Sequence, residues 1–168
     1  MNLINIIKSK FARFYYPIRI KKVSKHCMDK PYVGGKSYVT SYTTLGKNVC
    51  FNGMSISGEG EVYIGDNFHS GTNCQIITSF HNYDFGSKIP YDETFINKDV
   101  IIEDNVWLGN NVIILGGCKI GEGAIIQAGS VVCKNIPKYA IAGGHPAIPF
   151  RYRDIKHYEL LKNKNKFH

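Results

Sequence analysis

The sequence of 168 residues lacks a hydrophobic run that could cross a membrane, and it lacks paired cysteines. A membrane-spanning helix needs about 18 or more consecutive apolar residues. The opening residues, MNLINIIKSK, contain no continuous apolar segment and no small-residue cleavage site, so we expect no secretory signal peptide. The five cysteines are scattered without a CxxC pair, which argues against a disulfide framework or a zinc ribbon and predicts a cytoplasmic protein.

Acidic residues are scarce as well, with 13 Asp and Glu against 21 Lys and Arg and a formal net charge of +8. The excess lies at the two ends: residues 1–30 carry eight basic side chains against one acidic, and residues 151–168 carry six against two. A basic protein often has an anionic partner such as nucleic acid. The segment between the ends is net negative and shows no aromatic–basic platform, so we expect no nucleic-acid partner.

A six-residue period organises the centre of the chain. Stepping by six from Ile102 meets an aliphatic residue at every position up to Val132, and the fourth residue after each is mostly small or β-branched. A chain with this period winds into a triangular coil whose faces are short strands and whose corners are tight turns rich in Gly, Asn and Asp. The inward residues then stack from coil to coil into one apolar column. The period therefore predicts an all-β solenoid, a parallel β-helix.

The limits of the period divide the chain into three parts. The solenoid is expected over residues 33–150, with an inserted loop at residues 82–99 where the period is broken. Residues 1–32 form an N-terminal segment with helix-like spacing of apolar residues among basic ones. This leader is either a cap over the open end of the solenoid or, through residues 1–22, a peripheral contact with an anionic membrane at the inner face. Residues 151–168 predict a basic C-terminal helix outside the coils.

Two segments carry a family resemblance. The stretch VIIEDNVWLGNNVIILGGCKIGEGAIIQAGSVVCKNIPKYAIAGGHPA, residues 100–147, resembles the hexapeptide-repeat acyltransferases, which form a left-handed parallel β-helix. The preceding HNYDFGSKIPYDETF resembles the branch that contains xenobiotic acetyltransferases and the O-acetyltransferases of bacterial surface polysaccharides. The resemblance covers residues 33–151. It implies a homotrimer with active sites at the subunit interfaces, and transfer of an acetyl group from acetyl-CoA to a hydroxyl or an amine.

The break in the period marks the expected catalytic site, because an insertion in a solenoid usually lies on its binding face. His81 is the last residue before the break, and a histidine suits the removal of a proton from an attacking hydroxyl. The resemblance also places the catalytic histidine at His81. The sequence contains no GxSxG motif, so direct attack of the acceptor on acetyl-CoA is the expected mechanism. We expect the three residues that follow His81 to bind the acceptor: Asn82, Tyr83 and Asp84. We expect three residues further along the loop to form a lid: Tyr91, Asp92 and Glu93.

The resemblance also implies which residues contact the cosubstrate. They are Trp107, Asn110, Ala128, Cys133, Lys134, Gly143 and Arg151, of which Lys134 and Arg151 are expected at the phosphates of CoA. Two positions depart from the family pattern. His145 stands where the family often has Asn or a small residue, and Cys133 stands where it often has Thr or Val.

The acceptor is left open by the sequence. A sugar hydroxyl in bacterial surface glycan biosynthesis is the first expectation, and the alternatives are N-acetylation of a nucleotide-linked amino sugar or O-acetylation of an antibiotic. A more remote alternative is a γ-class zinc carbonic anhydrase, which needs three histidine ligands. Because the six histidines include no close pair, we expect no metal. A non-catalytic solenoid is the remaining alternative.

Overall fold

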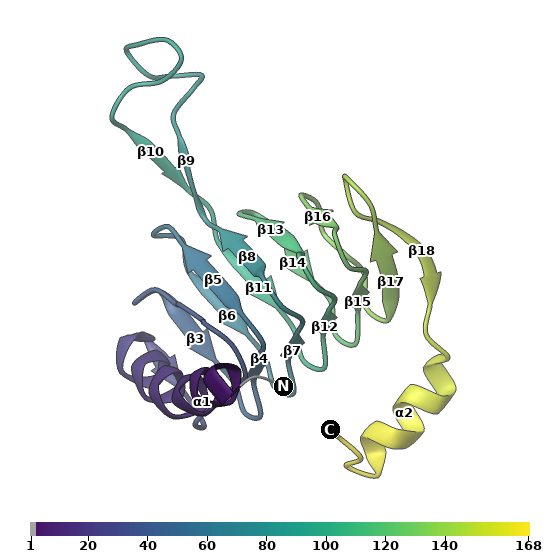
Figure 1. The fold of residues 1–168 in the computed structure, drawn as a ribbon. Helices are drawn as coiled ribbons and strands as arrows, with labels where there is room; N and C mark the ends of the chain where they lie inside the picture. Colours follow the sequence, from purple (N-terminus) through teal and green to yellow (C-terminus); the bar gives the residue numbers. More distant parts are fainter. Residues whose placement is uncertain (1–2) are drawn as a thin grey trace.

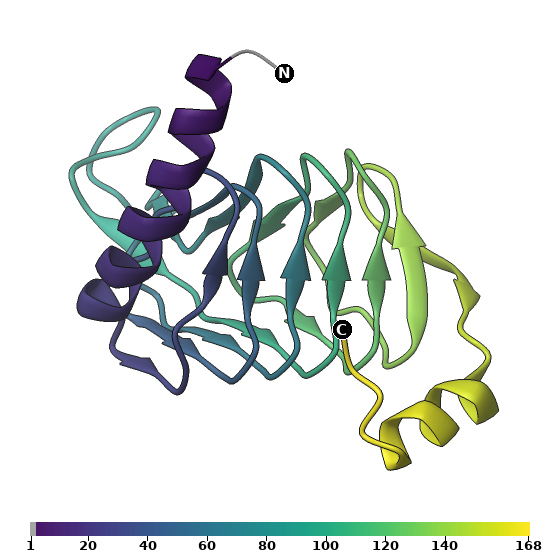
Figure 2. The same ribbon diagram turned by 60° about the horizontal axis from the view of Figure 1, so that its bottom comes forward.

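A computed structural model describes the chain from residue 3 to residue 168, with side chains described for residue 11 and residues 13–168. Short parallel strands wind around one axis and form a three-sided prism with a helix at each end (Figure 1, Figure 2). The chain visits the three sheets in a fixed order, so each coil crosses every sheet once. The prediction of a β-solenoid is confirmed. Of the N-terminal leader, residues 1–2 and the side chains of residues 3–10 and 12 lie outside the described part.

Each face of the prism is one sheet. Sheet A contains β1 (His26–Cys27), β3 (Thr43–Leu45), β6 (Val62–Ile64), β11 (Val100–Ile102) and β14 (Lys119–Ile120). Sheet B contains β2 (Tyr32–Val33), β4 (Cys50–Phe51), β7 (His69–Ser70), β12 (Trp107–Leu108), β15 (Ile125–Ile126), β17 (Ala140–Gly143) and the antiparallel β18 (Ile148–Tyr152). Sheet C contains β5 (Met54–Ser57), β8 (Cys74–Ile77), β13 (Ile113–Leu115) and β16 (Val131–Val132). The first strand thus precedes residue 33, and the last extends beyond residue 150.

The six-residue period corresponds to the inward column of the solenoid. Its aliphatic members are fully buried: Ile102, Leu108, Ile114, Ile120, Ile126 and Val132. The small or β-branched residues four places later are buried as well: Val106, Val112, Cys118, Ala124, Ser130 and Ile136. Complete burial of one such aliphatic side chain contributes roughly 1.5–3 kcal/mol. The core is therefore one continuous column along the axis.

Asparagine and aspartate shape the corner between sheets A and B. Asn67 and Asn105 both have positive φ, which Asn tolerates better than most residues. The Asn67 side-chain amide donates to the Asn105 oxygen at 3.0 Å, and the Asp66 backbone N–H donates to the Asp104 carboxylate at 2.7 Å. These contacts join one coil to the next. The Asn-rich turns are thus part of the stack.

A hairpin arm interrupts the solenoid between β8 and β11. Its strands β9 (Ser79–His81) and β10 (Phe95–Asn97) pair antiparallel, and the arm projects from the corner where sheet C meets sheet A (Figure 1). Gly116 lies beneath it, because a Cβ at this position would come within 2.7 Å of the Lys98 carbonyl oxygen. The arm coincides with the break in the sequence period.

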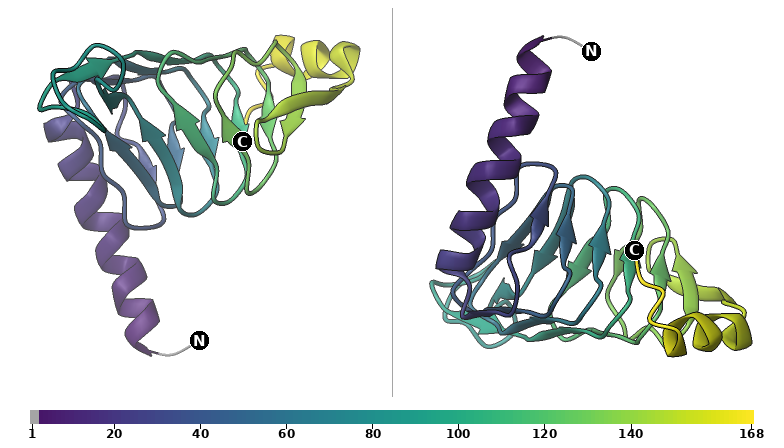
Figure 3. Two further views of the ribbon diagram at one scale, coloured as in Figure 1. Left: turned by 90° about the horizontal axis from the view of Figure 1, so that it is seen from above. Right: turned by 90° about the horizontal axis from the view of Figure 1, so that it is seen from below.

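Helix α1 (Leu3–Val23) lies across the first coil and extends past its edge (Figure 3). Ile20 is buried against the coil, and the guanidinium of Arg19 lies 5.0 Å from the centre of the Tyr38 ring. Phe11 and Phe14 remain 60% and 69% exposed. Among the described residues, no helix is both long and apolar enough to cross a membrane. Part of α1 therefore covers the end of the core, and part presents aromatic side chains to the surroundings.

Helix α2 (Ile155–Asn163) is fixed to the last coils by a polar cluster. Glu122 accepts a hydrogen bond from the Tyr158 hydroxyl at 3.1 Å and pairs with Lys162. Burial raises the pKa of Glu122, but Lys162 and the Tyr158 hydroxyl outweigh it and hold this pKa below its ordinary value. The Arg153 side chain donates to the Gly123 carbonyl at 2.6 Å. These contacts place the helix beside the outer face of sheet B.

Candidate active site

The predicted catalytic histidine stands on the hairpin arm. His81 ends β9 and lies opposite Phe95 of β10. Its ring stacks on Tyr91 with centroids 3.7 Å apart and planes inclined by 13°, and it contacts Phe95 at 4.6 Å and 35°. Cross-strand neighbours in an antiparallel pair share a face, which explains the contact with Phe95. Tyr91 reaches the imidazole from the loop.

The two ring nitrogens of His81 have different surroundings. Among the described residues, Nδ1 of His81 is the one buried side-chain nitrogen or oxygen without a hydrogen-bond partner. Nε2 is not buried in this way, so it is the nitrogen that a substrate could reach. A proton on Nδ1 would leave the lone pair of Nε2 free to act as a base.

The three expected acceptor-binding residues differ in their roles within the arm. The Asn82 side-chain oxygen accepts from the Phe85 backbone N–H at 3.1 Å, and the Asn82 backbone N–H donates to the Thr94 carbonyl at 3.1 Å. Asn82 therefore shapes the turn that follows His81. Tyr83 and Asp84 are exposed next to it. All three lie within the chain segment directly after the imidazole.

The outer face of sheet B carries a second group of candidate residues. Parallel pairing aligns one outward side chain per coil into a ladder, which runs Tyr32, Cys50, His69, Trp107, Ile125 and Ile141. The antiparallel strand β18 extends this ladder by placing Arg151 beside Ile141. Trp107 is half-exposed in the middle of this ladder. The ladder is mostly apolar around Trp107 and basic at Arg151. We call it the outer ladder.

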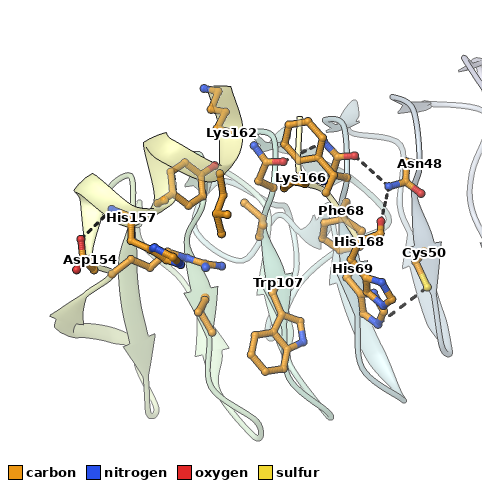
Figure 4. A pocket seen from close by; sticks show the side chains of 18 of the residues that line it. Asn48, Cys50, Phe68, His69, Trp107, Asp154, His157, Lys162, Lys166 and His168 are labelled. Atoms are coloured by element: carbon orange, nitrogen blue, oxygen red, sulfur yellow. Dashed lines mark hydrogen bonds between the residues drawn. The ribbon is translucent and has the colours of Figure 1, made fainter. Parts of the chain in front are cut away.

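A groove of about 1100 Å³ runs beside the outer ladder, with α2 and the C-terminal residues as its other wall (Figure 4). Its lining includes five basic side chains near α2: Arg151, Arg153, His157, Lys162 and Lys166. Lys162 is paired with Glu122, whereas within the described residues Arg151 forms no ion pair. The groove thus combines an apolar strip with a basic end, a combination that suits an elongated anionic ligand.

Asn52 and His69 also line this groove, and neither of them is among the site residues expected from the sequence. The Asn52 side-chain amide lies 3.2 Å from Nε2 of His69, and the His69 ring stacks on His168 with centroids 5.8 Å apart. Burial and the neighbouring His168 lower the pKa of His69. His69 is the cross-strand neighbour of Trp107. The coil and the inserted arm together separate equivalent positions by 38 residues here, so the six-residue period alone does not pair His69 with Trp107.

Comparisons with known proteins agree with this architecture. Residues 99–134 match the family described as bacterial transferase hexapeptide (six repeats). The chain is 34% identical to the galactoside O-acetyltransferase of Lactococcus lactis, over 61% of this chain and 52% of the relative. It is 32% identical to YvoF of Bacillus subtilis, over 69% of this chain and 66% of YvoF. The chain belongs to the hexapeptide-repeat acyltransferases.

Solved structures of the family support the same fold. A hexapeptide-repeat acetyltransferase of Vibrio cholerae complexed with acetyl-CoA superposes with a TM-score of 0.66 at 25% identity, covering 88% of this chain and 84% of that one. A maltose O-acetyltransferase of Clostridium difficile gives a TM-score of 0.74 at 23% identity, covering 91% and 90%. The left-handed β-helix of the hexapeptide-repeat family is confirmed. The chain spans about half the length of some curated relatives, such as the galactoside O-acetyltransferase.

The remaining cosubstrate candidates of this hexapeptide-repeat protein lie on two edges of the prism. Asn110 and Ala128 follow β12 and β15, and Gly143 is the last residue of β17. They line the corner between sheets B and C, where the Gly129 N–H donates to the Asn110 carbonyl at 2.8 Å. The Asn110 side-chain oxygen accepts from a backbone N–H of the preceding coil at 2.9 Å. Asn110 is therefore engaged in the corner stack.

The last two candidates, Cys133 and Lys134, lie elsewhere. They follow β16 at the corner between sheets C and A, the edge that carries the arm. Both are exposed. This edge is opposite the outer ladder. Within one chain, His81 is thus near the edge of Lys134 and away from Trp107 and Arg151.

Metal ligands do not gather in the described part of the chain. No three His, Cys, Asp or Glu side chains among these residues are close enough to hold a metal ion together. His69 and His81, the two histidines inside the repeats before the loop, stand on different parts of the prism.

Proposed function

We propose that this chain is an acetyl-CoA-dependent O-acetyltransferase that acetylates a sugar hydroxyl, with His81 as the general base. The observation that carries the proposal is the reachable Nε2 of His81 on an arm of a hexapeptide-repeat solenoid. Relatives named as acetyltransferases act on galactosides and on chloramphenicol. These names support acyl transfer to a hydroxyl.

His81 supplies the proton transfer in this reaction. Nε2 removes the proton of the acceptor hydroxyl as its oxygen attacks the thioester carbonyl carbon. The tetrahedral adduct then collapses, the carbon–sulfur bond breaks, and the protonated imidazole returns the proton to the departing thiolate. The products are an acetyl ester and free CoA, and His81 is neutral again. No group on the protein is acetylated.

The outer ladder is the proposed path of the cosubstrate. Trp107 and Ile125 provide an apolar strip for the pantetheine arm, and Arg151 provides a cation for a phosphate. At the neighbouring corner, Gly129 has a φ of 73° and open space around it, so an arm could lie close to the backbone. Asn110, Ala128 and Gly143 line the same corner. Cys133 and Lys134, on the opposite edge of the prism, would contact a cosubstrate that is bound to the outer ladder of a neighbouring copy.

The catalytic site is proposed to lie between two copies of the chain. His81 and Trp107 are on opposite sides of one prism, so a site that uses both takes them from neighbouring copies. A closed ring of copies repeats this contact around one axis. The family resemblance favours a homotrimer.

The N-terminal helix is the proposed contact with an anionic membrane. Phe11, Phe14 and Ile18 are exposed on α1, and Lys21 and Lys22 are exposed in its last turn. An apolar strip with flanking cations suits the interface of an anionic bilayer. Pelleting with anionic vesicles, before and after Phe14→Ser, tests this contact. Equal pelleting of both proteins would contradict it.

A thiol-release assay across a panel of acceptors tests the function itself. The panel contains simple glycosides, nucleotide-linked amino sugars and chloramphenicol, each with acetyl-CoA at fixed concentration. We expect the fastest release with a sugar hydroxyl and an ester product by mass spectrometry. An amide product on an amino sugar, or a preference for chloramphenicol, would replace the proposed acceptor. No acetylated product with any of them would contradict the proposal.

A further inference from the structure

The tip of the arm is held together by one carboxylate. Asp92 is 9% exposed, and its Oδ2 accepts from the Ser87 backbone N–H at 2.7 Å and from the Ser87 hydroxyl at 3.1 Å. Its Oδ1 accepts from the Thr94 backbone N–H at 2.9 Å and from the Thr94 hydroxyl at 2.6 Å. Hydrogen bonds to an ionised carboxylate are among the stronger ones in proteins. Asp92 therefore ties Ser87 to Thr94 and closes the loop between β9 and β10.

The residues beside this carboxylate are the aromatic partners of His81. Tyr91 precedes Asp92 and stacks on the imidazole at 3.7 Å, and Phe95 follows Thr94 and contacts it at 4.6 Å. Gly86 leaves room for the closed loop, because a Cβ there would come within 3.0 Å of the Asp92 carboxyl carbon. The hydrogen bonds of Asp92 thus set where both rings lie.

The two rings limit the motion of the imidazole. A histidine at the end of an exposed strand would otherwise rotate about both side-chain torsions. With Tyr91 parallel to its plane and Phe95 tilted against it, rotation of the His81 ring out of this plane is blocked. The remaining orientation buries Nδ1 and leaves Nε2 within reach.

We propose that Tyr91 and Phe95 form an aromatic clamp that positions the His81 imidazole for proton transfer, and that Asp92 keeps the clamp closed. This inference rests on the proposed role of His81 as the base. Tyr91, Phe95 and Asp92 are positioning residues, since they act through His81. A clamp of this kind aligns the lone pair of Nε2 before the acceptor arrives, which lowers the barrier by orientation.

Two variants of the clamp separate stacking from the tyrosine hydroxyl. Tyr91→Ala removes the stacked ring, and we expect kcat to fall about 10- to 100-fold while KM for acetyl-CoA stays within about twofold. Tyr91→Phe keeps the ring and should retain wild-type kcat. Asp92→Asn should lower kcat in the same direction as Tyr91→Ala. Ile89→Ala, at a 98% exposed position of the same arm, is the matched control and should leave kcat unchanged.

An NMR measurement gives a readout that does not depend on turnover. The carbon-bound ring protons of His81, assigned by their loss in His81→Ala, should be shifted upfield by the stacked rings. They should move toward the position of a free imidazole in Tyr91→Ala and stay in place in Tyr91→Phe. Resonances that do not move in Tyr91→Ala would overturn the clamp.

The kinetic results then decide whether the clamp matters for catalysis. If the resonances move but Tyr91→Ala keeps wild-type kcat while His81→Ala is inactive, the positioning role is overturned and the base role stands. If His81→Ala keeps wild-type turnover, the proposed function of His81 fails, and the positioning role fails with it. All substitutions are confined to the arm, so we expect the solenoid to remain folded in each variant. Circular dichroism of each variant checks this.

Discussion

Complementation between two defective variants tests whether one catalytic site is built from two chains. His81→Ala removes the proposed base on the arm, and Trp107→Ala removes the centre of the outer ladder on the opposite side of the prism. Each variant alone should have little activity. When the two are co-expressed, a site is intact wherever an arm with His81 meets a neighbour with Trp107.

The expected recovery follows from this geometry. In a random equal mixture, half of the arms carry His81 and half of the neighbours carry Trp107, so about one quarter of the sites are intact in a closed ring. Purification through a different tag on each variant selects mixed rings. In a mixed trimer, one of the three sites is then intact, which is about a third of the sites. In a mixed dimer, one of two sites would be intact, which is about half. The assay is thiol release from acetyl-CoA.

A second pair of variants is the control. Trp107 and Arg151 belong to the same outer ladder of one chain, so a mixture of Trp107→Ala and Arg151→Ala never restores a complete ladder. We expect no recovery from this pair. A catalytic site shared between two chains would be refuted if mixed rings of His81→Ala and Trp107→Ala, verified by both tags, stayed at the summed activity of the parents.

Three further predictions concern the core, the groove and the arm. Ile114→Ala should lower the free energy of unfolding by about 2–5 kcal/mol in urea titrations, because Ile114 is fully buried in the column; a change under about 1 kcal/mol would contradict this. Arg151→Ala should raise KM for acetyl-CoA about tenfold and change KM for acetyl-dephospho-CoA little. Arg13→Ala, on α1, should leave KM for acetyl-CoA unchanged. The hydrogen bonds from Thr94 and Ser87 lower the pKa of Asp92, so the ionised carboxylate stabilises the arm above the ordinary Asp range of about pH 3.9, and this contribution disappears only as the pH falls through the lower folded-state pKa. Amide exchange of the arm, corrected for intrinsic rates, should therefore stay slow near pH 3 in the wild type and be fast in Asp92→Asn; equal exchange in both proteins would count against it.

The solenoid could be predicted because its core residues recur along the sequence at a fixed spacing. Ile102 and Ile120 are inward residues of sheet A three hexapeptides apart, and both lie in the buried column. Turn residues such as Asn105 and Asn111 mark the corners by tolerating positive φ. Each of these signals is local, so the period and the corners are visible without knowing how the coils pair.

The groove could not be predicted in this way. His69 and Trp107 are neighbours on adjacent coils, but the arm inserts residues between them, and a fixed step of six does not cross that insertion. The stack of Tyr91 on His81 likewise depends on the path of a loop without a period. The proposed catalytic role of His81 is predicted from its place at the break together with the family resemblance. The side chains that surround His81 are visible only in the folded arm.

The rate of acetyl transfer by His81→Ala tests the central claim most directly. The variant is compared with the wild type and with His26→Ala, which removes an exposed histidine on β1, after size-exclusion chromatography shows the same assembly for all three. We predict that His81→Ala loses about 10²- to 10⁴-fold in kcat while His26→Ala keeps it. Wild-type kcat in a correctly assembled His81→Ala protein would contradict the account.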